Sequence, residues 1–372
     1  MPWVIWRYLS MLPRTPVLFS VLFASLAPPL LAQAETLRIA TFNTELSRKG
    51  PGLLLRDITR GEDAQIAAVI TVITEAQPDI LVLQGLDWDH DNLALKALAR
   101  QLAQEGATYP HLFAGQPNAG LATDLDLDGD GRLGGPGDSQ GFGDYTGRGG
   151  MAVLSRYPLV VEELLDLSPL VWRDVPGAAL PQHPDGSPFP SKPAQAIQRL
   201  SSTAHWVLPV ELANGSRLTL LCFQAAPPVF DGIEDRNGLR NADEIRLWQV
   251  FLDGLLDGLL DGQLPAEFAR PPTQRFVIAG GANLDPDTGA GRRETIARLL
   301  QDPRLQDPRP LSPQGGAQTV DWGEGRRMRV DYLLPSQDWH VAASGVIWPD
   351  SATSAAAIAS RHRLVWLDIL LD

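Results

Sequence analysis

Short apolar segments recur along the whole chain, and most of them end in turn-forming residues. Their alternating or β-branched composition is typical of buried strands. The predicted strands are residues 37–43, 80–84, 151–155, 218–224, 276–280, 330–334 and 364–370. Many of these strands follow one another without a crossover helix. The pattern therefore favours a two-sheet α/β sandwich over a doubly wound parallel sheet.

Helical periodicity is clearest between the first two strands. In residues 62–76, Ile66, Val69, Ile70 and Ile73 recur at the spacing of one helix face, which predicts an amphipathic helix. The other predicted helices are residues 93–103, 242–260 and 292–300.

The predicted helix 242–260 carries Asp243 and Glu244 in its first turn, where negative charge suits the helix dipole. Two stretches rich in Gly, Pro or Asp are predicted as loops, residues 124–150 and 176–193. No composition change divides residues 35–372, so we expect one domain there.

The N-terminal segment has the features of a secretory signal. Residues 16–31 form an uncharged, mostly apolar run of 16 residues, below the roughly 20 that a membrane-spanning helix needs. The run is preceded by Arg7 and Arg14 and followed by Ala32-Gln33-Ala34, a small-x-small cleavage pattern. We predict that residues 1–34 are removed and that the protein is secreted or periplasmic, without a transmembrane segment. An uncleaved N-terminal anchor is the alternative.

Charge and cysteine content limit the function classes. Loss of residues 1–34 would remove two arginines and no acid, so the formal net charge would change from −13 to −15. No basic cluster is present, which argues against tight binding to bulk nucleic acid. Cys222 is the only cysteine and lies in an apolar strand pattern, so we expect a buried, inert thiol and no intrachain disulfide.

Six short motifs occur in an order that resembles the endonuclease/exonuclease/phosphatase family. They are Ile39-Ala40-Thr41-Phe42-Asn43, residues 78–84, residues 150–156, Gly280-x-x-Asn283, Arg329-Val330-Asp331-Tyr332 and Ser360-x-His362. The resemblance covers residues 35–372 and implies the deoxyribonuclease-like four-layer α/β sandwich, with two mostly antiparallel sheets flanked by helices. Residues 227–248 further resemble one secreted bacterial branch of the family.

The resemblance implies a specific chemistry. In this family a divalent cation, usually Mg²⁺, is held by carboxylate and amide oxygens and assists hydrolysis of a phosphoester. Matching positions keep Asn43 as an amide ligand, Asn283, and the pair His362 and Asp331, in which the Asp orients the His.

Four other positions depart from the family pattern. Gly85 stands where the family has a metal-binding Glu, and Gln224 stands where it has a catalytic His. Gly281 replaces the Asp that activates water, and Arg361 replaces an Asp that helps to hold the metal. Gln cannot take up a proton near neutral pH, so Gln224 cannot act as the acid or base that the His provides. Together the four replacements remove most of the acid–base and metal-binding groups.

The replaced positions change the predicted charge of the site. Three carboxylates are lost and one guanidinium is gained, and an Arg about 5 Å from Mg²⁺ would repel it by roughly 6–7 kcal/mol at an effective dielectric constant of about 20. We therefore do not expect Mg²⁺ at this site. We expect a pseudoenzyme that binds a small anionic or phosphoester ligand through five side chains, Asn43, Gln224, Asn283, Arg361 and His362.

Alternatives to this prediction remain open. One is an active metal-dependent phosphodiesterase or phosphatase that uses substitute carboxylates, which are Asp87, Asp89, Asp285 and Asp287. A decayed site without a ligand is another. A protein-interaction scaffold, with unknown partners, would rest only on the long acidic and Pro-rich loops.

A second metal site is predicted in the acidic loop. Residues 126–131 alternate Asp with other residues and contain glycines, as at the start of an EF-hand calcium loop. Gly137 occupies the twelfth position, where a Glu is expected, so the motif is incomplete. The predicted calcium ligands are Asp124, Asp126, Asp128, Asp130 and Asp138.

Overall fold

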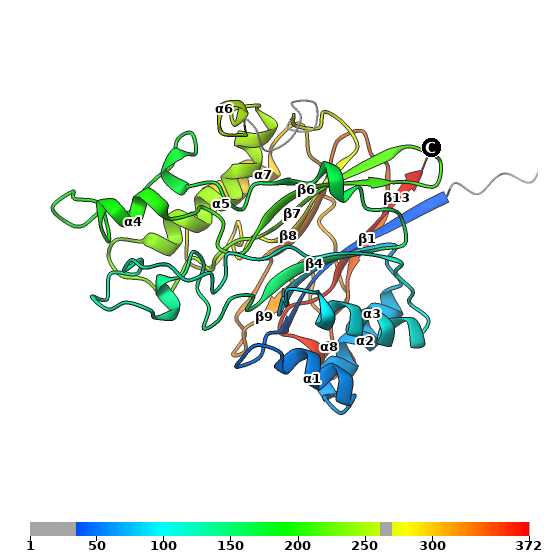
Figure 1. Ribbon diagram of the computed structural model, residues 1–372. Coiled ribbons are helices and arrows are strands. Elements are labelled where there is room, and N and C mark those ends of the chain that lie inside the picture. The colour runs from blue at the N-terminus through cyan, green and yellow to red at the C-terminus, as the bar shows by residue number, and fades with distance from the viewer. Residues whose placement is uncertain (1–34, 261–269, 372) are drawn as a thin grey trace, which may run out of the picture. The chain divides into compact units, whose positions relative to one another are not determined.

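The computed structural model describes residues 35–260 and 270–371, and the predicted signal segment lies outside them. Its strands form two large sheets and one small hairpin (Figure 1). Among the described residues, no helix combines the length and the apolar character that crossing a bilayer requires.

The first sheet has six strands in the order β12-β13-β1-β2-β4-β3. Their bounds are β1 Glu35–Leu46, β2 Ile80–Leu86, β3 His111–Phe113, β4 Gly150–Ser155, β12 Val341–Val346 and β13 Val365–Leu371. Strands β1 and β2 are parallel, and all the other neighbours are antiparallel.

The second sheet has five strands in the order β11-β8-β7-β6-β5. Their bounds are β5 Leu165–Asp166, β6 His205–Glu211, β7 Arg217–Gln224, β8 Phe276–Gly281 and β11 Asp331–Pro335. Here β7 and β8 are the parallel pair. A separate hairpin pairs β9, Val320–Asp321, with β10, Arg327–Met328.

Helices cover the outer faces of both sheets. The α-helices are α1 Leu53–Arg60, α2 Ala64–Ala76, α3 Leu93–Gln104, α4 Lys192–Ile197, α5 Arg236–Leu252, α6 Asp257–Leu260, α7 Arg293–Leu300 and α8 Ala355–Ala359. Three short 3₁₀ turns are Pro136–Asp138, Val161–Glu163 and Trp172–Asp174. Figure 1 shows α1, α2, α3 and α8 together on one side of the structure, and α5 and α7 on the other.

Three apolar cores join the layers into a four-layer α/β sandwich. The central core lies between the sheets and contains Ile39, Val82, Leu220 and Val277. A second core packs the other face of the first sheet against α1, α2, α3 and α8, and a third packs the second sheet against α5 and α7. Because both faces of each sheet are buried, central strands such as β2 and β8 are apolar along most of their length.

All seven predicted strands are present to within two residues at their starts, and the predicted two-sheet sandwich is confirmed. The prediction missed β3, β5, β6, β9, β10 and β12, and four of these have only two or three residues. Strand β6 contains Pro209, which lowers strand propensity, and β12 consists largely of Ala, Ser and Gly. Cys222 is fully buried, as predicted, and burial raises the pKa of its thiol.

The predicted helix 242–260 is wrong at both ends. Helix α5 begins at Arg236 and ends at Leu252, and α6 begins only at Asp257. The chain between them contains Gly254 with φ +69°, a left-handed conformation that interrupts a helix.

Asp243 and Glu244 consequently lie in the interior of α5, and their role is different from the predicted one. Asp243 accepts hydrogen bonds from Trp172 Nε1 at 2.7 Å and from the backbone of Ala179 at 2.8 Å. Glu244 accepts from the backbone and the hydroxyl of Ser202 and from the backbone of Ala226. Both carboxylates therefore tie loops to the helix, because buried acceptors must be satisfied.

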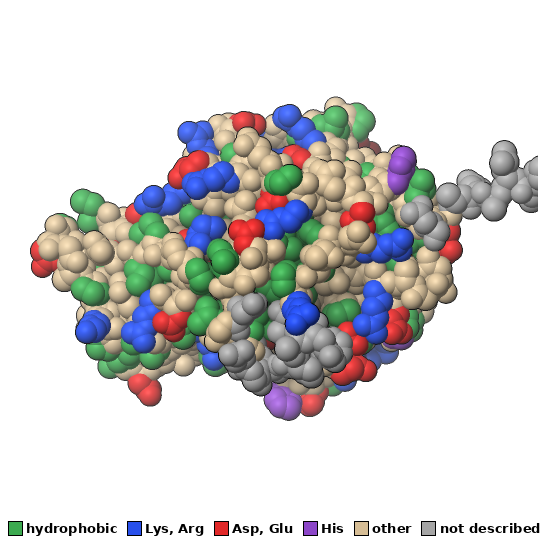
Figure 2. All heavy atoms as spheres, turned by 90° about the horizontal axis from the view of Figure 1, so that it is seen from above, with side chains coloured by type: hydrophobic (Ala, Val, Ile, Leu, Met, Phe, Trp, Pro, Cys, Tyr) green, Lys and Arg blue, Asp and Glu red, His purple; other side chains and the backbone are tan. Residues whose placement is uncertain are grey.

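Charges on the surface are mixed in sign. On the face drawn in Figure 2, Lys and Arg side chains are interspersed with Asp and Glu. This face offers no broad basic area of the kind that follows a nucleic-acid backbone.

Candidate functional site

The ends of the two parallel strand pairs bring the family-matching residues together. In the first sheet Asn43 is paired with Gln84, and in the second Gln224 is paired with Gly281. Gly281 is in turn paired with Asp331 on β11. The carboxyl ends of parallel strands lie at one edge of a sheet, and ligands in α/β proteins bind at this edge. Asn43, Gln84, Gln224 and Gly281 all lie at such strand ends.

A cleft with two lobes opens at this edge. One lobe has a cavity volume of about 990 Å³ and the other of about 770 Å³. The residues that line both lobes are Asn43, Glu45, Pro227, Phe230 and Asn283.

The two lobes differ in charge, and we name them accordingly. The acidic lobe is lined by the five carboxylates of Glu45, Asp128, Asp130, Asp231 and Glu234 and by the three guanidinium groups of Arg148, Arg236 and Arg240. The basic lobe is lined by Glu45 and by Arg326, Arg327 and Arg361, together with His362. An anion is therefore better placed in the basic lobe.

All five predicted ligand-binding side chains line this cleft. Asn43 and Asn283 line both lobes, Gln224 lines the acidic lobe, and Arg361 and His362 line the basic lobe. The structure thus separates Gln224 from Arg361 by the boundary between the lobes.

His362 and Asp331 form a buried pair. Nδ1 of His362 lies 2.9 Å from Oδ2 and 3.1 Å from Oδ1 of Asp331, and both side chains are at most 3% exposed. The same carboxylate accepts a hydrogen bond from Thr319 Oγ1 at 2.8 Å. Because a carboxylate only accepts, Nδ1 carries the donated proton. Trp322 packs its ring at right angles to the imidazole, with 5.2 Å between centroids, so the imidazole is held in a defined orientation.

Glu45 and Arg361 form an ion pair at the boundary of the lobes. Glu45 accepts hydrogen bonds from the backbone of Arg361 at 2.8 Å, from Arg361 Nε at 2.9 Å and from Ser360 Oγ at 3.0 Å. Burial would raise the pKa of Glu45, but the hydrogen bonds from Arg361 and the nearby His362 outweigh it and hold the pKa below its usual value. Arg361 also lies over the Trp322 ring, 4.9 Å from its centroid.

The sequence-based charge estimate overlooked Glu45. It counted no carboxylate at the site, whereas the structure places this one beside Asn43 and Arg361. A sequence signal existed, because residues two apart in a strand point to the same face. However, Glu45 has φ +49° and lies where the register of β1 against β2 is irregular, so regular alternation does not decide its direction.

Gly85 is enclosed by Asn43 and Glu45. A Cβ atom at this position would lie 2.5 Å from Asn43 Oδ1 and 2.9 Å from the backbone nitrogen of Glu45. Its φ of +69° is also unfavourable for any residue with a side chain. The chain has therefore packed around the glycine, and a Glu would not fit here without a shift of β1.

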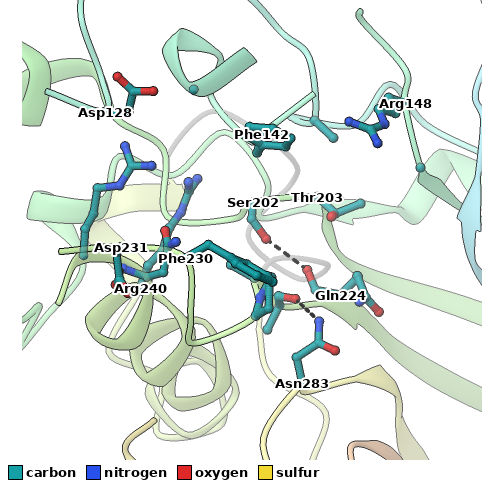
Figure 3. Close-up of a pocket in the computed structure, with 18 of the residues that line it drawn as sticks. Asp128, Phe142, Arg148, Ser202, Thr203, Gln224, Phe230, Asp231, Arg240 and Asn283 are labelled. Atoms are coloured by element: carbon teal, nitrogen blue, oxygen red, sulfur yellow. Dashed lines mark hydrogen bonds between the residues drawn. The ribbon is translucent and has the colours of Figure 1, made fainter. Parts of the chain in front are cut away.

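Gly281 is enclosed in the same way. A Cβ atom there would overlap Oε1 of Gln224. This oxygen is buried and has no hydrogen-bond partner among the described residues. Figure 3 shows Gln224 between Ser202 and Asn283, whose Nδ2 donates to the carbonyl of Ala225 at 2.8 Å. The Gln224 side chain thus fills the space that a larger residue at position 281 would require.

Three of the four acidic residues considered as substitute metal ligands accept hydrogen bonds elsewhere in the structure. Asp87 is buried and accepts from Arg48, Tyr145 and Gly149, and burial raises its pKa. Asp89 accepts from the first backbone N–H groups of α3, and Asp285 accepts from backbone N–H groups that include that of Arg329. Within the described part of the chain, these three and Asp287 are absent from the lining of both lobes.

Three of the five predicted calcium ligands come together. Carboxylate oxygens of Asp126, Asp128 and Asp130 lie within 4.8 Å of one another, close enough to hold a metal ion. Asp124 is not part of this group. Asp138 is buried and accepts from the backbone of Leu127 and Gly135. Asp138 thus stabilises the loop, and its role as a calcium ligand stays a prediction.

We predict that Gly85→Ala destabilises the protein by about 1–3 kcal/mol more than Gly61→Ala, because overpacking is added to the backbone strain. Gly61 is a matched control, since its φ is +68° and a Cβ there would meet no atom within 4 Å. Urea unfolding of the two variants measures the difference. Equal losses of unfolding free energy would contradict the close packing around Gly85.

Comparison with known proteins agrees with this geometry. A search of curated proteins finds no match, whereas many solved structures match. An endonuclease/exonuclease/phosphatase from Beutenbergia cavernae is 17% identical with a TM-score of 0.51, covering 90% of this chain and 72% of that chain. A family protein from Leptotrichia buccalis is 16% identical with a TM-score of 0.51, covering 90% of this chain and 100% of that chain. At this identity the likeness concerns the fold alone. The sequence model of the endonuclease/exonuclease/phosphatase family matches residues 40–362, and the chain therefore belongs to that family.

Proposed function

We propose that the protein binds a small anionic or phosphoester ligand in the basic lobe and does not hydrolyse it by the metal-dependent mechanism of its family. The observation that carries this proposal is the ion pair of Glu45 and Arg361. A guanidinium group lies at the position where the family pattern has a metal-binding carboxylate.

The donor set does not fit a hard divalent cation. The family pattern implies carboxylates at positions 85, 281 and 361, and the residues here are Gly85, Gly281 and Arg361. Glu45 supplies one carboxylate, but Arg361 already neutralises it. Mg²⁺ requires near-octahedral oxygen ligands, and a single carboxylate paired with a cation is a poor substitute.

The basic lobe has the features of an anion site. The lining contains three guanidinium groups and one carboxylate, a formal charge of +2 without His362. Two of these groups have carboxylates nearby outside the lining, since Arg327 pairs with Asp321 at 2.9 Å and Arg326 lies 4.0 Å from Glu324. The Arg361 side chain is 61% exposed, so part of its planar group is accessible to a ligand. Guanidinium groups bind phosphate oxygens through two parallel hydrogen bonds, which favours phosphoesters over halide ions.

Bulk nucleic acid is not the expected ligand. The formal net charge is −13, and the charges on the face in Figure 2 are mixed. The acidic lobe adjoins the basic lobe and would repel a long phosphate backbone that extended through both.

We predict that the purified protein binds methyl phosphate in the absence of metal and that Arg361→Gln weakens this binding about ten-fold or more, because a charge-assisted hydrogen bond is lost. Arg56→Gln, on the exposed surface of α1, is the control and should bind normally. Isothermal titration calorimetry measures both variants. Absence of binding to the unmodified protein would refute the proposed function.

A hydrolysis assay on the same purified protein distinguishes the proposed binding function from the alternative of an active enzyme. We expect no turnover of bis-p-nitrophenyl phosphate with Mg²⁺ or Mn²⁺. Metal-dependent turnover that survives repeated purification would favour an active phosphodiesterase or phosphatase with substitute ligands.

We further propose calcium at the Asp126, Asp128 and Asp130 cluster. Burial, and to a smaller extent the nearby carboxylates of Asp130 and Asp138, raise the pKa of Asp128. The contribution of the carboxylates is a repulsion that a cation would relieve. The bound ion would order the loop beside the acidic lobe.

We predict that calcium slows protease cleavage within residues 124–150. Replacing both Asp128 and Asp130 with Asn should abolish the effect, whereas Asp124→Asn, outside the cluster, should preserve it. Peptide mapping after limited proteolysis gives the result. Cleavage that is insensitive to calcium in the unmodified protein would refute the site.

We also propose export with removal of residues 1–34. Expression of the full chain in a bacterial host should yield a periplasmic or secreted protein that begins at Glu35, as determined by N-terminal sequencing. Ala32→Arg should block cleavage, because the site requires small residues, whereas Gln33→Ser should not. An intact N-terminus in the membrane fraction would instead support an anchor.

A further inference from the structure

We propose that Phe230 is a stacking platform and that the ligand of the basic lobe is an anion that carries a flat aromatic ring. This inference rests on the proposed anion binding and adds the chemical class of the ligand. The anionic group would lie toward Arg361 and His362, and the ring would lie against Phe230 at the boundary of the lobes.

The position of Phe230 is the first argument. Its residue is 89% exposed, although a large apolar side chain is usually covered. It is one of the five residues that line both lobes, and the only aromatic residue among them. Phe230 is therefore an apolar surface inside a cleft that otherwise has mainly polar and charged groups at its centre.

The backbone of Phe230 is the second argument. Its φ is +71°, a left-handed conformation that is costly for a bulky residue. Such strain persists only where neighbouring contacts enforce it, and it is concentrated at functional sites.

Contacts on both sides of Phe230 enforce this conformation. Asn237 Nδ2 donates to the carbonyl of Val229 at 2.8 Å, on one side. On the other side the Asp231 carboxylate accepts from the backbone of Asn237 at 2.6 Å and of Gly238 at 3.3 Å. The first turn of α5 thus clamps the chain immediately before and after Phe230. The loop is built to hold this ring outward.

The other aromatic rings that line the cleft already contact side chains of the protein. Trp322, in the basic lobe, is covered by Arg361 and contacts His362. Phe142 lines only the acidic lobe, and Arg148 lies over its ring at 5.9 Å. Figure 3 shows the rings of Phe142 and Phe230 on opposite sides of Ser202. Among the described residues, no ring or guanidinium contact engages Phe230.

Three phosphomonoesters of equal charge test the inference by calorimetry on the purified protein. We expect 1-naphthyl phosphate to bind about ten-fold more tightly than cyclohexyl phosphate or methyl phosphate, since stacking on an aromatic residue contributes affinity of this order. Phe230→Ala should abolish the preference. Phe230→Trp should retain the preference, and Phe142→Ala, in the other lobe, should not alter it.

The outcomes separate this inference from the proposed function. If methyl phosphate binds but naphthyl phosphate binds no more tightly than cyclohexyl phosphate, the platform is refuted and anion binding stands. If Phe230→Ala keeps the preference, the platform is likewise refuted. If none of the three esters binds, the proposed function fails and this inference fails with it.

A stability measurement excludes a merely structural role. Phe230→Gly should raise the thermal unfolding midpoint, because glycine adopts φ +71° without strain and the exposed ring contributes no packing. The same variant should lose the preference for the naphthyl ester. A lower midpoint would mean that Phe230 stabilises the fold, which would overturn its assignment as a ligand platform.

Discussion

The packing of the two sheets against each other is the constraint on which the rest of the structure depends. Side chains such as Ile39, Val82, Leu220 and Val277 fill the space between the sheets. A one-residue slip in any strand would turn side chains that fit one core toward the core on the other face, so the pairing register is strongly specified. That register places Asn43 beside Gln84 and brings Gln224, Gly281 and Asp331 into line. The cleft at the strand ends is therefore a consequence of the core.

The departures from the family pattern are physically coupled. Gly85 is enclosed by Asn43 and Glu45, and Gly281 by Gln224, while Glu45 is held by Arg361. Gln224 fills the space that a side chain at position 281 would need, and Arg361 neutralises the carboxylate of Glu45. We interpret them as one rearranged site, in which an ion pair takes the place of carboxylates around a cation. His362 and Asp331 keep their contact within this rearrangement.

Two loops give the cleft its individual features. The acidic loop supplies Asp128 and Asp130 to one lobe, and the loop between β7 and α5 presents Phe230 at the boundary. Loops of this kind can vary without disturbing the core, because the sheets and helices carry the stability. The proposed ligand class and the proposed calcium site both rest on these loops, whereas the family membership rests on the strands.

The sequence by itself determined seven of the thirteen described strands, the family and the replaced positions, because apolar runs and motif order are local properties. It did not determine the start of α5, since Asp243 and Glu244 are held by contacts with residues far away in the chain. It also did not reveal Glu45 as a member of the site, because an irregular strand end sets its direction. The division of the cleft into an acidic and a basic lobe was likewise decided only by the tertiary structure. Net charge is a sum over the chain, whereas the field at a ligand depends on which side chains the packing brings together.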